Sequence, residues 1–185
     1  MIFFSLRVFG RENVPGKGGV LIASNHQSFL DPILIGVGLK RQIHYMARRS
    51  LFKNVFFRWF IKSLNAFPVK REGMNAGAIK QAIALLRRGE VVLLFPEGTR
   101  TGDGTVGSIQ SGFGMIARRA GVPLIPAVID GAFEAWPRTR RIFRFAPIGV
   151  VFGKPLEAKG EALNEAVAHS LAQLQQKIRL VKFRC

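Results

Sequence analysis

The chain has 185 residues, of which 48% are hydrophobic, and its formal net charge is +17. This length suits one domain, since single cores run to roughly 100–200 residues, and the apolar fraction excludes a disordered basic tail. One cysteine, Cys185, excludes a disulfide framework or a cysteine zinc site, and three scattered histidines do not indicate a metal site. The composition therefore predicts a compact basic protein with an anionic partner.

Apolar runs alternate with helical patterns along the chain. Strands are expected at 20–23, 43–47, 66–69, 91–95, 123–129 and 148–152, and helices at 31–39, 51–62, 74–88, 112–120 and 162–180. The helix at 31 is expected to open with Asp31 as its N-cap, followed by Pro32. Continuous apolar strands are typical of a sheet covered on both faces. The pattern predicts a single α/β domain over residues 1–185, with a mainly parallel central sheet flanked by helices.

Two polar loops directly follow expected strands, one at residues 24–28 and one at 96–107. In open α/β sheets, ligands bind at the carboxyl ends of the strands. We therefore expect both loops to contribute to one functional site.

The first loop places a histidine, His26, five residues before an aspartate, Asp31. Such a pair serves general-base catalysis, because a neutral imidazole takes a proton from a hydroxyl while the carboxylate holds its other ring nitrogen. The pair also has a structural interpretation, in which Asp31 caps a helix and His26 covers the end of the sheet. The spacing alone leaves both open.

The second loop reads Phe95-Pro96-Glu97-Gly98-Thr99-Arg100. Its glycine lets the backbone approach a ligand, its hydroxyl and free N–H groups are neutral donors, and its guanidinium binds a phosphate bidentately. A phosphate would repel Glu97, so that side chain is expected to orient an arginine or to line the path of a hydroxyl. The alternative is a surface turn with a solvated arginine.

In this order the two loops resemble the glycerolipid acyltransferases, specifically the 1-acylglycerol-3-phosphate acyltransferases. That family carries an N-H-x-x-x-x-D block, a basic block ending in arginine, an F-P-E-G-T-R block and an apolar block with an I-P pair. The corresponding segments here are 25–31, 67–71, 95–100 and 122–128. The resemblance covers roughly residues 10 to 155, and the first and third blocks match completely.

The resemblance implies acyl transfer from a thioester, either acyl-CoA or an acyl-carrier protein, to the free hydroxyl of 1-acylglycerol-3-phosphate, giving phosphatidic acid. It implies a general base, His26, with Asp31 as its partner. It also implies a glycerophosphate site made by Arg71, Glu97, Gly98, Thr99 and Arg100, and an acyl or thioester region near Pro126. Direct transfer from a thioester needs no metal and no nucleotide cofactor.

The chain departs from the family pattern in two places. Where the family usually has Lys-x-Gly before the fourth block, this chain has Gln110-Ser111-Gly112. Without that lysine, either Arg71 and Arg100 do more of the phosphate binding or the acceptor is another lysolipid. Family members also often begin with a longer hydrophobic region, whereas the first strand here is expected at about residue 20.

Positive charge is concentrated between residues 32 and 71, where nine Lys or Arg occur and no acidic residue does. Within it, residues 51–62 are expected to form a helix with an apolar stripe of Phe52, Val55, Phe56, Trp59 and Phe60. This stripe either lies in a membrane interface, with cations at anionic headgroups, or faces the protein core. No run reaches the roughly 18 apolar residues of a spanning helix, and no signal-peptide core is present. We therefore expect a peripheral enzyme on the cytoplasmic face of a membrane.

The rival from another class is a basic nucleic-acid-binding domain. Its charge fits, but no RRM, zinc-finger or KH signature occurs, so we expect no nucleic-acid partner. An acyl-serine mechanism is disfavoured because the chain has no G-x-S-x-G sequence.

Overall fold

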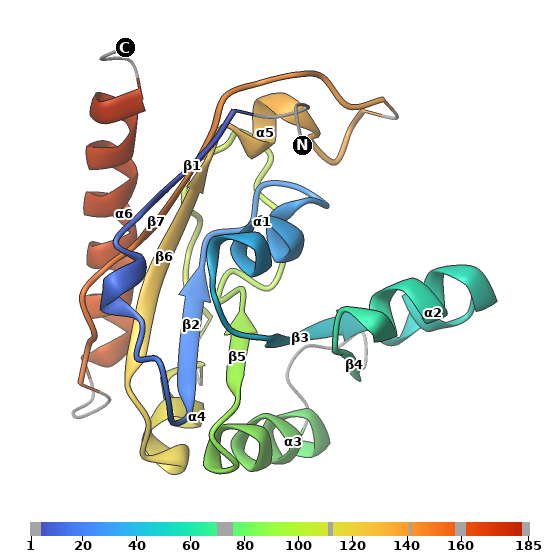
Figure 1. Cartoon of the computed structure of the whole chain (residues 1–185), viewed down its shortest axis with the longest axis vertical. Coiled ribbons are helices and arrows are strands. Elements are labelled where there is room, and N and C mark those ends of the chain that lie inside the picture. Colours follow the sequence, from blue (N-terminus) through green and yellow to red (C-terminus); the bar gives the residue numbers. More distant parts are fainter. Residues whose placement is uncertain (1–4, 70–75, 111–112, 141, 158–161, 183–185) are drawn as a thin grey trace.

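The computed structural model describes residues 5–69, 76–110, 113–140, 142–157 and 162–182 (Figure 1). Its strands form one seven-stranded sheet in the order β1-β7-β6-β2-β5-β3-β4. The strands are β1 (Leu6–Phe9), β2 (Val20–Ser24), β3 (Ile43–Arg48), β4 (Ala66–Val69), β5 (Val91–Leu94), β6 (Leu124–Asp130) and β7 (Ile148–Phe152). The five from β6 to β4 run parallel, and β7 is antiparallel to β6. This confirms a single α/β domain with a mainly parallel sheet.

Helices cover both faces of this sheet. They are α1 (Asp31–Gly38), α2 (Val55–Ser63), α3 (Ala76–Arg87), α4 (Phe113–Ala120), α5 (Ala132–Ala135) and α6 (Leu163–Lys182). One core cluster joins the sheet to α1 and α5, and the other joins its opposite face to α3, α4 and α6. The central strands β2, β5 and β6 are buried along their whole length, as their unbroken apolar sequences predict.

The expected helix at 51–62 is divided in two. A short 3-10 turn spans Arg49–Phe52, and α2 begins only at Val55, because the Asn54 side chain accepts a hydrogen bond from Phe57 N at 3.0 Å and caps the new helix. Only Ile61 of α2 is buried, and Figure 1 shows α2 projecting from the body of the fold beside β3 and β4. The apolar stripe of α2 therefore does not face the core.

The expectation that the first strand lies near residue 20 is wrong, because β1 precedes it and pairs in parallel with β7. This strand lies at the edge of the sheet, and its residues alternate between half-buried and exposed. An edge strand of four residues lacks the continuous apolar run by which the central strands are identified. Within the described ranges, no helix combines the length and apolar character that crossing a bilayer requires.

Candidate active site

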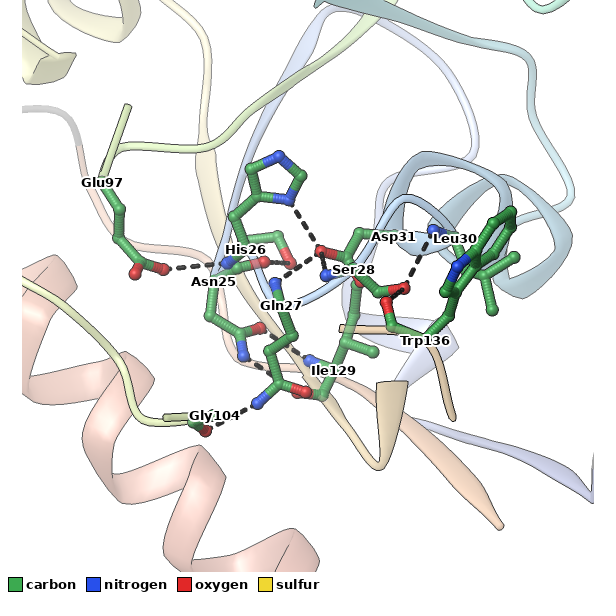
Figure 2. A network of polar contacts seen from close by, with 11 residues as sticks. Asn25, His26, Gln27, Ser28, Leu30, Asp31, Glu97, Gly104, Ile129 and Trp136 are labelled. Carbon is green, nitrogen blue, oxygen red and sulfur yellow. Dashed lines mark hydrogen bonds and ion pairs between the residues drawn. The ribbon is translucent and has the colours of Figure 1, made fainter. Parts of the chain in front are cut away.

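The loop after β2 brings the histidine and the aspartate together at the carboxyl edge of the sheet. His26 Nδ1 lies 2.7 Å from Asp31 Oδ2, and the His26 ring stacks on Phe95 with its centroid 3.9 Å away (Figure 2). Asp31 is fully buried, whereas the His26 side chain is 20% exposed and lines a cavity. The second ring nitrogen points away from Asp31. The imidazole is thus fixed on one edge and open on the other.

Asp31 is held from the loop rather than from the helix. Its Oδ2 accepts hydrogen bonds from the backbone N–H groups of Gln27 and Ser28, at 2.6 and 2.8 Å, beside that from His26. The expectation that Asp31 is the N-cap of α1 is wrong, because Leu30 holds that position and Asp31 is the first helical residue. Its carboxylate turns back toward the loop, where three donors converge on one oxygen.

The loops are also braced against the rest of the fold. Both polar atoms of the Asn25 side chain bond the backbone of Ile129 in β6, at 2.9 and 2.8 Å. Gln27 Nε2 donates to the Gly104 carbonyl at 2.7 Å (Figure 2), and Gln175 of α6 donates to the same oxygen at 2.9 Å. Central strand, second loop and α6 therefore position the segment that carries His26.

Glu97 joins the two loops. One oxygen accepts from His26 N at 2.8 Å, and the other accepts from Gly107 N at 3.0 Å. Burial raises the pKa of Glu97, and the two backbone hydrogen bonds lower it in part. Glu97 is outside the lining of the cavity, so the structure places it behind His26 rather than beside a ligand. Its partners are backbone amides, whereas the sequence suggests either that it orients an arginine or that it lines the path of the hydroxyl.

Gly98, Thr99 and Arg100 all line the cavity. Gly98 has φ +69°, a left-handed backbone conformation that favours glycine, and the Gln110 side-chain amide occupies the space where a Cβ would lie. The Arg100 guanidinium lies over the Phe29 ring, 3.6 Å from its centroid, and its Nη1 is buried without a hydrogen-bond partner among the described residues. A buried donor of this kind is costly unless a ligand satisfies it.

Two further arginines reach the same cavity. Arg48 ends β3 and Arg138 follows α5, and both line the cavity with Arg100. Burial lowers the pKa of Arg100, and the positive charges of Arg138 and Arg48 lower it further. Like charges held together in this way favour an anion between them. Sequence reasoning missed both residues because neither belongs to a recognisable motif.

The structure bears differently on three other residues singled out from the sequence. Arg71 falls outside the described residues. Pro126 lies inside β6, where its carbonyl accepts a hydrogen bond from Gly153 N at 2.8 Å, and it does not line the cavity. Gln110, which replaces the expected lysine, does line it, and its backbone N–H donates to Pro96 at 2.9 Å.

The cavity itself has a volume of about 360 Å³. Its polar lining includes His26 and Arg100, and most of its other lining residues are apolar. These include Tyr45, Leu51, Phe57, Phe60, Leu64 and Leu94. Burial raises the pKa of Tyr45 to about 12, which keeps its phenol neutral. One cavity therefore combines an imidazole, three cations and a surface suited to a hydrocarbon chain.

Comparisons with known proteins agree with these features. A family model described as Acyltransferase matches residues 5–130. The 1-acyl-sn-glycerol-3-phosphate acyltransferase of Bacillus subtilis is 34% identical over 184 residues, covering 94% of this chain and 89% of that protein. The chloroplastic enzyme LPAT1 of Arabidopsis thaliana, which bears the same name, is 30% identical over 89% of this chain, which spans 48% of that longer protein.

A solved structure matches the whole fold. The crystal structure of the 1-acyl-sn-glycerophosphate acyltransferase PlsC from Thermotoga maritima gives a TM-score of 0.84 at 30% sequence identity, covering 96% of this chain and 73% of that chain. Both kinds of comparison confirm the resemblance drawn from the loop sequences. This chain belongs to the acyltransferase family and is an O-acyltransferase.

Proposed function

We propose that this enzyme transfers a fatty acyl group from an acyl thioester to the free hydroxyl of 1-acylglycerol-3-phosphate, giving phosphatidic acid. One observation carries the proposal: His26, whose ring is held by Asp31 on one side only, and Arg100 line the same cavity, most of whose other lining residues are apolar. The names of the relatives from Bacillus subtilis and Arabidopsis thaliana support this acceptor.

His26 acts as the general base in this proposal. Asp31 accepts a hydrogen bond from Nδ1–H and so leaves Nε2 free to take the proton of the acceptor hydroxyl. The hydroxyl oxygen bonds to the thioester carbonyl carbon, the C–S bond breaks, and His26 returns the proton to the departing thiolate. Asp31 stabilises the transient imidazolium. The transfer requires neither a metal nor a nucleotide cofactor.

Arg100 binds the acceptor phosphate, assisted by Arg48 and Arg138 on the cavity wall. An incoming phosphate accepts hydrogen bonds from the Arg100 guanidinium and offsets the repulsion that Arg138 and Arg48 exert on it. We expect Arg71, Gly98 and Thr99 to contribute as the family resemblance implies. Glu97 takes no phosphate contact in this scheme and acts by fixing the backbone of His26.

The proposed enzyme is peripheral, attached to the cytoplasmic face of a membrane through α2. Phe56 and Trp59 on this helix are 88% and 74% exposed, while Phe57 and Phe60 line the cavity. A helix that is exposed on one side and forms the cavity wall on the other places the site close to a lipid surface. Phe56→Glu with Trp59→Glu is expected to abolish activity on vesicular acceptor and to spare activity on a monomeric short-chain acceptor.

The acceptor is tested with three matched lysolipids that share one acyl chain and differ only in the headgroup: a phosphate monoester, a phosphocholine and a free hydroxyl. Each is assayed with acyl-CoA and with acyl-carrier protein, with and without EDTA. We expect the phosphate monoester to give the highest kcat/KM and EDTA to change nothing. Equal kcat/KM for the acceptor without phosphate would contradict the proposed role of Arg100.

A further inference from the structure

A second exposed apolar surface lies beside the cavity, and its exposed apolar residues have no role in the site described so far. It is the rim segment, defined as residues 136–140 and 142–145, which follows α5. Ile142 and Phe145 are 78% and 68% exposed. No acidic residue occurs between Glu134 and Glu157, whereas four arginines fall between residues 138 and 144. Large exposed apolar side chains interleaved with cations distinguish this surface from an ordinary solvated loop, in which exposed side chains are mostly polar.

Aromatic contacts connect the rim segment to the cavity. The Phe29 ring, over which the Arg100 guanidinium lies, is 5.6 Å from the Trp136 ring, measured between centroids. Trp136 lies 6.4 Å from Phe143, and Phe143 lies 5.9 Å from Phe145. Since a residue of the same segment, Arg138, lines the cavity, the rim segment stands at the cavity mouth.

The backbone of the rim segment is braced. Arg144 N donates to the Ala135 carbonyl at 2.7 Å, and Trp136 Nε1 donates to the Arg140 carbonyl at 3.1 Å. Ala146, which follows directly, packs against the core cluster that contains α1 and α5. The exposed Ile142 and Phe145 are therefore presented from an ordered loop, at a lower entropic cost of binding than from a free one.

The rim segment and α2 border the same cavity although they are about 80 residues apart in the sequence. Phe57 and Phe60 of α2 line it together with Arg138 of the rim segment. Ile61 of α2 belongs to the core cluster of α1, and Ala146, directly after the rim segment, packs against that cluster, while α6 covers the opposite face of the sheet (Figure 1). Two basic and apolar elements around one mouth match a flat, negatively charged, partly apolar surface.

We propose that the rim segment is a second membrane-contacting element, which inserts Ile142 and Phe145 into an anionic bilayer while its arginines bind the headgroups. This inference rests on the proposed function, because it assigns a lipid surface as the source of the acceptor. With α2 it gives attachment on two sides of the mouth, so that a lysolipid enters the cavity from the bilayer without crossing water.

The test measures vesicle binding by cosedimentation for Ile142→Glu with Phe145→Glu. The matched control is Leu180→Glu with Val181→Glu, which makes the same charge change at exposed apolar residues of α6. On vesicles of phosphatidylglycerol and phosphatidylcholine, we expect the rim variant to lose about 10- to 100-fold in partition coefficient. The control is expected to bind as the wild type does. Activity of the rim variant on a monomeric short-chain acceptor is expected to be unchanged, which separates this inference from the proposed chemistry.

A second variant removes charge alone and so leaves the packing of the loop intact. Arg140→Gln with Arg144→Gln is expected to weaken binding to anionic vesicles about 10- to 30-fold at low salt, and much less at high salt. Normal vesicle binding by either folded rim variant overturns the proposal. So does failure of the wild type to bind anionic vesicles, or a loss of vesicle binding by the α6 control that equals that of the rim variant. Loss of RNA binding by the rim variants with vesicle binding retained would assign the surface to nucleic acid instead.

Discussion

Replacing Asp31 by asparagine tests how the His26 ring is held. The carboxylate oxygen Oδ2 accepts three hydrogen bonds, from His26, Gln27 and Ser28, at 2.6 to 2.8 Å. An asparagine that turns its oxygen to these donors keeps three bonds and loses their charge assistance, at about 1 kcal/mol for each. Its amide nitrogen then occupies the place of Oδ1, which is buried without a partner among the described residues. We therefore expect a loss of about 2–4 kcal/mol in the free energy of unfolding, measured in urea.

The same substitution is expected to lower kcat about 10²- to 10⁴-fold, because a neutral amide oxygen no longer stabilises the imidazolium that forms as His26 takes the proton. Initial rates are measured at saturating acceptor and donor, under conditions in which circular dichroism shows that the variant is folded. KM for the acceptor is expected to change little, since Asp31 does not line the cavity. A folded Asp31→Asn enzyme within tenfold of the wild-type kcat would refute the role given to this pair.

Three further substitutions test other parts of the site. Arg100→Ala is expected to raise the acceptor KM at least tenfold with kcat within a few fold, because the phosphate is present in both ground and transition states. Glu97→Gln places an NH₂ group against a backbone N–H and is expected to lower stability by about 1–2 kcal/mol and to lower kcat. Burial raises the Glu97 pKa above 4.5, so the folded state binds this proton more tightly than the unfolded state does. The free energy of unfolding of the wild type is therefore expected to fall as the pH rises from 4.5 to the folded pKa. Urea unfolding of Glu97→Gln should lack this pH dependence, because glutamine does not titrate. Gln110→Lys is expected to lower the KM of a phosphate-bearing acceptor. An unchanged KM would show that a lysine at this position does not contribute to phosphate binding in this enzyme.

The sheet was predictable because its central strands are buried on both faces. β2 and β5 are short apolar runs of fully buried residues, and such runs need no tertiary information to be identified. The edge strand β1 alternates in burial and contains Arg7, so its pairing with β7 depends on a partner 142 residues away. The break before α2 follows from one cap, Asn54, whose effect is visible only once the backbone is known.

The part of the candidate site formed by contacts between side chains was predictable from the sequence. His26 and Asp31 are close in sequence, and their contact follows from a loop that folds back on a helix start. The place of Glu97 was not predictable, because its partners are the backbone N–H groups of His26 and Gly107 and no residue type marks them. The position of Arg48 in the cavity lining was not predictable for a different reason. It depends on the order of the strands in the sheet.

The most direct measurement compares acyl transfer to 1-acylglycerol-3-phosphate by the wild type and by His26→Ala, with acyl-CoA and acyl-carrier protein as donors. His169→Ala is the matched control, because that histidine is exposed on α6 and bonds only Gln173 among the described contacts. We predict phosphatidic acid formation by the wild type and the control, and a kcat lower by about 10²- to 10⁴-fold in a folded His26→Ala enzyme. Near-normal turnover by His26→Ala would contradict general-base catalysis at this site.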